Sequence, residues 1–188
     1  VNQSFNRITV DGDTSTNDAC TLSATGASGV DIHDCVGEFQ SALDEVTQSL
    51  AHQIIKDGEG ATKFVEVRVK GGESNVDCLE VAYTVAHSPL VKTALFASDA
   101  NWGRILAAVG RANIKDLSIE DINIALNDVN IIQAGEPNKG YTEAAGSAEM
   151  AKEDIVITIE IGKSDAQESV WTTDFSYDYV KINAEYRT

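Results

Sequence analysis

The stretch FVEVRVKGGESNVDCLEVAYTVA, residues 64–86, contains the alternation of strand and helix that decides the fold. Its first part alternates valines with charged residues, which is typical of a half-buried strand (Val65, Val67 and Val69 against Glu66, Arg68 and Lys70). Two glycines then interrupt the pattern. Ser74 and Asp77 resemble a capping box, and apolar residues recur at helical spacing as far as Ala86. The stretch therefore predicts a strand followed directly by a helix.

The rest of the chain continues this alternation and then becomes richer in strands. An apolar stripe from Val36 to Ile54 predicts a long helix that ends near Gly58. Pro89 is expected to stop the helix before it. Further helices are predicted over residues 102–110 and 142–152, and further strands or short apolar elements over residues 5–10, 21–25, 91–97, 122–126, 129–132, 155–161 and 170–187. We therefore predict an α+β (mixed α/β) fold.

The predicted elements divide into two lobes. Residues 1–114 are predicted to form an α/β lobe, and residues 115–188 a strand-rich lobe. The second lobe ends in YVKINAEYRT, residues 179–188, which is strand-like to its last residue. Chain ends usually fray unless they are held in place. We therefore expect the C-terminal strand to be docked and to reach an active site.

Composition excludes several classes of partner. The 188 residues include 30 acidic and 14 basic side chains, for a net charge of −16. Such a surface is a poor partner for nucleic acids and for anionic membranes, and no apolar run is long enough to span a bilayer. The three cysteines and three histidines show no metal-ligand spacing, so no metal site is expected. The chain begins at Val1 without Met or a signal peptide, which indicates a cut chain or a fragment.

The segment DGEGATK, residues 57–63, places Glu59 between two glycines. It follows a helix and leads into a strand, which is the opposite order to a dinucleotide-binding loop. Glycines let a backbone approach a ligand closely, and a carboxylate in that position can bind an ammonium group. A helix cap with an exposed glutamate is the other interpretation, and the residues alone leave both open.

Five stretches, in this order, carry a resemblance to one family: FNRITVDGDTSTND at 5–18, DGEGATK at 57–63, SPLVKTA at 88–94, DANWGRILA at 99–107 and DYVKINAEYRT at 178–188. Together they resemble the bifunctional glutamate N-acetyltransferase/ornithine acetyltransferase (ArgJ) family of arginine biosynthesis. The resemblance implies a DmpA/ArgJ-like fold with mixed sheets flanked by helices. For Asp99–Arg104 we keep a structural interpretation, as the start of a helix that supports the site.

The resemblance also implies a mechanism. Members of the family make a precursor that cuts itself before a threonine, which then heads the second (beta) subunit and acts as the nucleophile. It takes the acetyl group from N2-acetyl-L-ornithine and passes it to L-glutamate, while the first (alpha) subunit supplies the oxyanion hole. The family implies a cytoplasmic heterotetramer of two alpha and two beta subunits. It implies no cofactor, and whether acetyl-CoA also serves as an acetyl donor is left open by the sequence.

This chain departs from the family pattern because no threonine in it matches the nucleophile. We therefore interpret it as the C-terminal part of the beta subunit, without a catalytic residue of its own and inactive alone. Three substrate-binding positions carry over by motif: Glu59 in DGEGATK, and Asn183 and Thr188 in INAEYRT. A carboxylate, an amide and a hydroxyl suit the ammonium and carboxylate groups of ornithine and glutamate.

Two other functions remain open at this stage. The first is an N-terminal-nucleophile amidohydrolase or aminopeptidase of the same fold, which would release free acetate or peptides. The second is a non-catalytic binding module, which would bind its ligand without partners.

Overall fold

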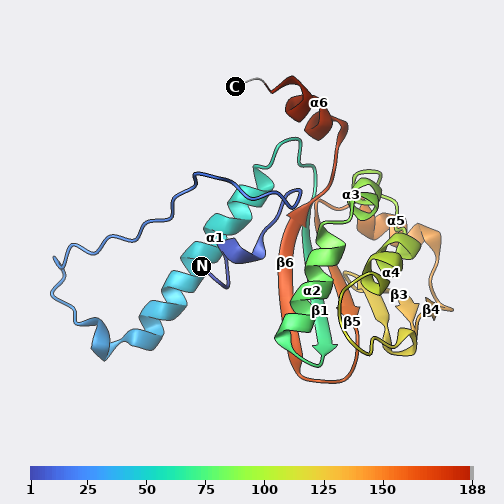
Figure 1. Cartoon of the computed structure of the whole chain (residues 1–188), viewed down its shortest axis with the longest axis horizontal. Helices are drawn as coiled ribbons and strands as arrows, with labels where there is room; N and C mark the ends of the chain where they lie inside the picture. Colours follow the sequence, from blue (N-terminus) through green and yellow to red (C-terminus); the bar gives the residue numbers. More distant parts are fainter. Residues whose placement is uncertain (187–188) are drawn as a thin grey trace.

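The computed structural model describes residues 1–186, and its centre is a six-stranded mixed sheet (Figure 1). The strands follow the order β4-β3-β2-β5-β1-β6. Strand β1 is parallel to β5, whereas the other neighbouring pairs are antiparallel. Their bounds are β1 Phe64–Gly72, β2 Asn123–Leu126, β3 Val129–Gln133, β4 Glu136–Pro137, β5 Asp154–Glu160 and β6 Ala166–Thr173. The predicted α+β (mixed α/β) fold class is confirmed.

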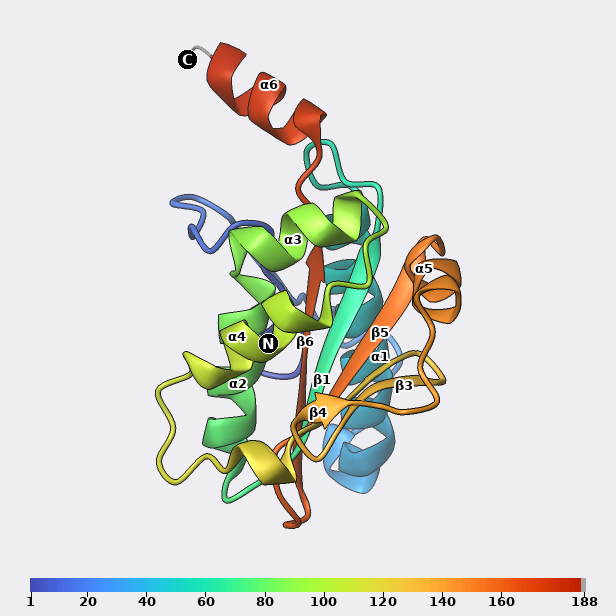
Figure 2. The same ribbon diagram turned by 90° about the vertical axis from the view of Figure 1, so that its right-hand side faces the viewer.

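The helices lie on both sides of this sheet. Helices α2, α3 and α4 lie on one side and α1 lies on the other (Figure 2). Helix α2 packs against β1 and β6 and also contacts α4. The α-helices are α1 Val36–Lys56, α2 Asn75–Ala86, α3 Pro89–Phe96, α4 Trp102–Gly110, α5 Glu143–Met150 and α6 Tyr177–Glu185, and the 3₁₀ helices are η1 Phe5–Arg7, η2 Ile32–Asp34 and η3 Ile119–Asp121.

The core lies between the sheet and α2 and α4. The alternation predicted from the sequence is present in β1, where Val65, Val67 and Val69 are buried. Strand β5 repeats it, with its isoleucines in the same core. The hydroxyl of Ser74 accepts a hydrogen bond from the backbone N–H of Asp77, so the predicted cap of α2 is confirmed.

Helix α1 spans the predicted residues, but its predicted apolar stripe is mostly exposed. It contacts the sheet mainly through β6, and its His52 ring packs against Trp171 of β6 and Phe64 of β1. The segment before it, residues 11–31, contains no helix or strand. Figure 1 shows that this segment and the first part of α1 project away from the sheet.

Three of the predicted strands are wrong. Residues 5–10 contain η1 and a single bridge from Ile8 to Trp171, and residues 21–25 have no regular structure. Residues 91–97 lie mostly in α3, because Pro89 occupies the first turn of that helix. Proline is well tolerated there, since the first N–H groups of a helix have no intrahelical acceptor. Pro89 therefore starts a helix as well as following one.

The predicted C-terminal strand is also wrong beyond Thr173. The strand β6 ends there, and residues 177–185 form α6. The hydroxyl of Ser176 accepts a hydrogen bond from the backbone N–H of Tyr179 and caps the helix. This local cap outweighs the alternation of aromatic residues that suggested a strand. A helix, and not a strand, therefore approaches the end of the chain.

The sheet crosses the predicted boundary between residues 114 and 115. Strand β1, from the first predicted lobe, lies between β5 and β6 of the second. The two-lobe division stays a prediction, but the two parts share one sheet. In the part of the chain that the structure describes, no helix combines the length and apolar character needed to cross a bilayer.

Candidate substrate-binding site

Glu59 lies in the turn between α1 and β1, and its side chain is exposed. The next residue, Gly60, has a φ of +66°. A Cβ at this position would lie 2.6 Å from both the hydroxyl of Ser176 and the backbone nitrogen of Tyr179. Glycine therefore lets the start of α6 pack directly against the Glu59 loop, residues 57–63. The loop is therefore packed against a second segment as well as ending α1, and the binding role of Glu59 stays a prediction.

The other two predicted residues belong to the C-terminal segment. Asn183 is exposed on α6, and its amide nitrogen donates a hydrogen bond to the backbone carbonyl of Tyr179 at 2.9 Å. Thr188 lies outside the described residues. Figure 1 shows α6 leaving the end of β6 beside the turn between α1 and β1. The structure thus brings the Glu59 loop next to the start of the helix that carries Asn183.

Tyr179 joins a third segment to this site. Its hydroxyl donates a hydrogen bond of 2.8 Å to the carboxylate of Asp11, in the motif at residues 5–18. Burial raises the pKa of the Tyr179 hydroxyl to about 12, and the hydrogen bond to Asp11 is the next cause. The charges of Asp11, Asp13 and Glu59 add to this rise. One carboxylate therefore binds this hydroxyl and two others act on it through their charge, and the resulting negative potential suits an ammonium group.

The sequence analysis did not single out Asp174, although it connects the segments of the site. Its side chain is buried between the end of β6 and the start of α6. The carboxylate accepts hydrogen bonds from the backbone N–H groups of Thr62 and Lys63 at 2.8 and 2.9 Å. Nothing in the sequence near Asp174 indicates this contact, because Thr62 and Lys63 lie more than a hundred positions earlier.

The sequence analysis quoted Lys92 as part of the motif SPLVKTA but did not assign it a role of its own. It lies in α3, and its side chain is fully buried. The ammonium donates hydrogen bonds to the hydroxyl of Thr172, at 2.8 Å, and to the backbone carbonyl of Thr173. Burial lowers the pKa of Lys92 to about 7, against the opposing charges of Asp174 and Asp11. A charge within an apolar run was the signal that could have identified it.

The DANWGRILA motif agrees with its structural interpretation. The side chain of Asn101 accepts a hydrogen bond from the backbone N–H of Arg104 and caps α4. The guanidinium of Arg104 then reaches the backbone carbonyl of Leu90 at 2.9 Å. The motif therefore ties α4 to α3, the helix that contains Lys92.

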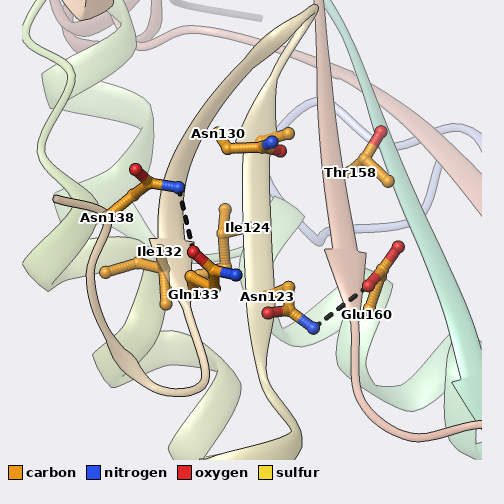
Figure 3. Close-up of a pocket in the computed structure, with 9 residues that line it drawn as sticks. Asn123, Ile124, Asn130, Ile132, Gln133, Asn138, Thr158 and Glu160 are labelled. Carbon is orange, nitrogen blue, oxygen red and sulfur yellow. Dashed lines mark hydrogen bonds between the residues drawn. The ribbon is translucent and has the colours of Figure 1, made fainter. Parts of the chain in front are cut away.

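A separate hollow lies on the open face of the sheet, away from the predicted residues (Figure 3). It has a volume of about 360 Å³ and is lined by β2, β3 and β5. Within it Asn123 donates to Glu160 at 3.1 Å, and Asn138 donates to Gln133 at 3.4 Å. Three of its four amide side chains are already partnered in this way, and neither Glu59 nor Asn183 lines it.

Comparison with known proteins first defines the fold. The chain matches the crystal structure of arginine biosynthesis bifunctional protein ArgJ from Bacillus halodurans with a TM-score of 0.92 and 38% sequence identity. The match covers 98% of this chain and 88% of the crystallised chain. The mixed sheet flanked by helices is therefore the fold of that protein.

The sequence comparisons then define the family. The ArgJ family profile matches residues 1–188. Proteins named arginine biosynthesis bifunctional protein ArgJ are 57% identical in Pseudomonas fluorescens (strain Pf0-1) and 53% identical in Methylococcus capsulatus (strain Bath). Each match covers 100% of this chain and 47% of the relative. The chain belongs to the ArgJ family, and it spans about half the length of the curated relatives that it matches.

Proposed function

We propose that this chain is the substrate-binding part of an enzyme that transfers an acetyl group from N2-acetyl-L-ornithine to L-glutamate. The observation that supports this most strongly is the meeting of three family motifs at Tyr179. The motif at residues 5–18 contributes Asp11, the loop at 57–63 contributes Glu59, and α6 contributes Tyr179 itself. In a member of the ArgJ family, such an acidic site suits the ammonium groups of ornithine and glutamate.

The proposed reaction is a covalent acyl transfer with two halves. An N-terminal threonine, which this chain does not contain, attacks the acetyl carbonyl of acetylornithine, and ornithine leaves with the proton on its amine. The α-amine of glutamate then attacks the threonine ester and regenerates the hydroxyl. The oxyanion hole of the first subunit stabilises both tetrahedral intermediates. No bound cofactor is needed, and acetyl-CoA is an alternative donor in the first half.

The predicted residues would bind substrate rather than react with it. Glu59 would pair with an ammonium group through a charge-assisted hydrogen bond. Asn183 would offer a donor and an acceptor, and Thr188 a hydroxyl. With the nucleophile and the oxyanion hole supplied from outside this chain, the chain would be inactive alone.

The proposed partner is the first subunit from the same precursor, in a cytoplasmic heterotetramer of two alpha and two beta subunits. Two observations support a partner of this kind. The curated relatives are about twice as long as the matched segment. Helix α1 also exposes an apolar stripe at helical spacing, formed by Val36, Phe39, Val46, Leu50 and Ile54. A stripe of this kind is typical of a helix face that packs against apolar surface.

The site assignment is tested by Glu59→Ala in the complete enzyme, assembled with the first subunit and the threonine-bearing segment. Loss of a charge-assisted hydrogen bond to substrate should lower kcat/KM by about 100-fold. Glu120→Ala is the matched control, because Glu120 is an exposed glutamate in η3, outside the three motifs of the site. A Glu59→Ala enzyme with a near-normal rate would reject the assignment.

Two further measurements separate the alternative functions. Release of free acetate without transfer to glutamate would indicate an amidohydrolase. Tight binding of ornithine to the isolated chain, measured by isothermal titration calorimetry, would indicate a binding module.

A further inference from the structure

Asp174 occupies the junction between two segments of the proposed site. It follows the last residue of β6 and precedes Ser176, the cap of α6. Its side chain is only 1% exposed, so it does not meet the solvent-facing groups of the site. A buried carboxylate is costly unless it is hydrogen-bonded, and its partners therefore show what it holds together.

Both oxygens of Asp174 bind the end of the Glu59 loop. Oδ1 accepts from the backbone N–H groups of Thr62 and Lys63, at 2.8 and 2.9 Å. Oδ2 accepts from the hydroxyl of Thr62 at 2.7 Å. The hydroxyl of Thr173 completes the set with a bond of 3.0 Å to Oδ1. Hydrogen bonds to a charged acceptor are about twice as strong as neutral ones, so the loop is firmly held.

A second contact fastens the middle of the same loop. The hydroxyl of Ser176 donates to the backbone carbonyl of Gly60 at 2.6 Å, while it accepts from the N–H of Tyr179. Glu59 therefore lies just before a residue bonded to Ser176, and three residues before one bonded to Asp174. Ser176 and Asp174, at the start of α6, therefore hold the loop at its middle and at its end.

Helix α3 holds the segment between β6 and α6 through contacts of Lys92. The ammonium of Lys92 binds Thr172 and Thr173, the residues before Asp174. It also lies 4.7 Å from the centre of the Phe175 ring, and the backbone N–H of Phe175 donates to the Lys92 carbonyl at 3.2 Å. The residues on both sides of Asp174 are thereby attached to a helix of the core.

We propose that Asp174 is a positioning residue, which holds the Glu59 loop against the start of α6 so that Glu59 and the helix carrying Asn183 face the substrate in one fixed geometry. This inference rests on the proposed function and adds a residue to it. Asp174 does not touch substrate; it acts through the loop. A displacement of about 1 Å in a positioned group can lower the efficiency of an enzyme by up to about 100-fold, so partial release of this loop should weaken substrate binding measurably.

The test uses the complete enzyme with Asp174→Ala and Asp174→Asn. The alanine variant loses all four hydrogen bonds, and we expect the KM values for acetylornithine and glutamate to rise about tenfold while kcat per active site changes little. The asparagine variant keeps an oxygen acceptor for the Thr62 and Lys63 amides, and its KM values should lie between those of the wild type and the alanine variant. This graded rise of KM is the signature of a positioning role.

Glu168→Ala is the matched control for a general loss of stability. It also deletes a carboxylate that is largely shielded from solvent, the one that pairs with Arg7 at 2.9 Å, but towards the opposite end of β6. It should lower the midpoint of unfolding and leave KM unchanged. If Asp174→Ala behaves like Glu168→Ala, with lower stability and an unchanged KM, the inference is overturned.

Hydrogen exchange supplies a readout that does not depend on activity. The amides of Thr62 and Lys63 should exchange faster in Asp174→Ala than in the wild type and in Glu168→Ala. If the wild-type enzyme transfers no acetyl group, the proposed function fails, while exchange still decides whether Asp174 holds the loop. Unchanged exchange at these amides would overturn the inference whatever the activity.

Discussion

Strand β1 and helix α1 both carry apolar stripes with a regular period, yet the two stripes have opposite environments. The valines of β1, Val65, Val67 and Val69, are at most 1% exposed. The stripe of α1 is 42–56% exposed at Val36, Phe39, Val46, Leu50 and Ile54. Both elements were predicted correctly from their period. Periodicity therefore shows which face of an element is apolar, but not whether the covering surface belongs to the same chain.

The largest effect should come from placing a charge in each stripe. We expect Val67→Asp to cost at least about 4 kcal/mol in the free energy of unfolding of this chain, because an unpaired carboxylate would enter the core. Leu50→Asp, the matched change on α1, should cost under about 0.5 kcal/mol because that position is open to solvent. Urea unfolding followed by circular dichroism measures both. Equal losses would contradict the contrast between the stripes.

A milder form of the same comparison removes methyl groups instead of adding charge. Ile157→Ala leaves a cavity beside the valines of β1 and should cost about 2–5 kcal/mol. Ile54→Ala removes the same atoms from the exposed face of α1 and should cost under about 1 kcal/mol. A cost of several kcal/mol at Ile54 would show that α1 is already covered within this chain.

Lys92 extends the comparison to a charge inside the core. Burial lowers its pKa from 10.5 to about 7, so above pH 7 the folded chain has released a proton that the unfolded chain keeps until about pH 10.5. Since the unfolded state binds more protons, stability rises with pH in this window, by at most about 1.4 kcal/mol per pH unit. The difference in unfolding free energy between the wild type and Lys92→Met should therefore increase in favour of the wild type from pH 7 to 9.

The control for this pH dependence is Lys56→Met, at an exposed lysine of α1. Its difference from the wild type should stay flat over the same range. A flat difference for Lys92→Met as well would mean that the buried ammonium keeps its ordinary pKa.

The smallest expected effect tests whether α1 opens independently of the sheet in hydrogen exchange. A Cβ at Gly37 meets no other atom within 4 Å, so Gly37→Ala should stabilise this helix by about 0.5–1 kcal/mol. Amides in the first part of α1 should then exchange severalfold more slowly, while those of β1 keep their rates. Slower exchange in β1 would show that α1 and the sheet open together.

Local patterns were sufficient for much of the fold. The alternation in β1 and β5, the stripe of α1 and the caps at Ser74 and Asn101 all depend on residues close in sequence. The errors have the same origin. Residues 91–97 and 177–185 contain apolar or aromatic runs compatible with either state, and capping or a proline at the first turn decided for a helix.

The candidate site was only partly predictable. Glu59 was identified from two flanking glycines and from a resemblance to the ArgJ family, and the structure gives Gly60 a contact that only glycine permits. Asp11 and Tyr179 lay within recognised motifs, but their hydrogen bond joins residues 168 positions apart. No local pattern encodes a contact over that distance.

The sequence by itself therefore determined the secondary structure of the strongly periodic segments, such as β1, β5, α1 and α2, and also the family and the acidic character of the chain. Only the tertiary structure placed Asp174 between the Glu59 loop and α6, buried Lys92 behind it and left the stripe of α1 uncovered. The physical reason is the distance along the chain over which each interaction acts. Backbone propensity and caps act within a few residues, whereas burial and hydrogen bonding of a side chain depend on whichever segments the folded sheet brings beside it.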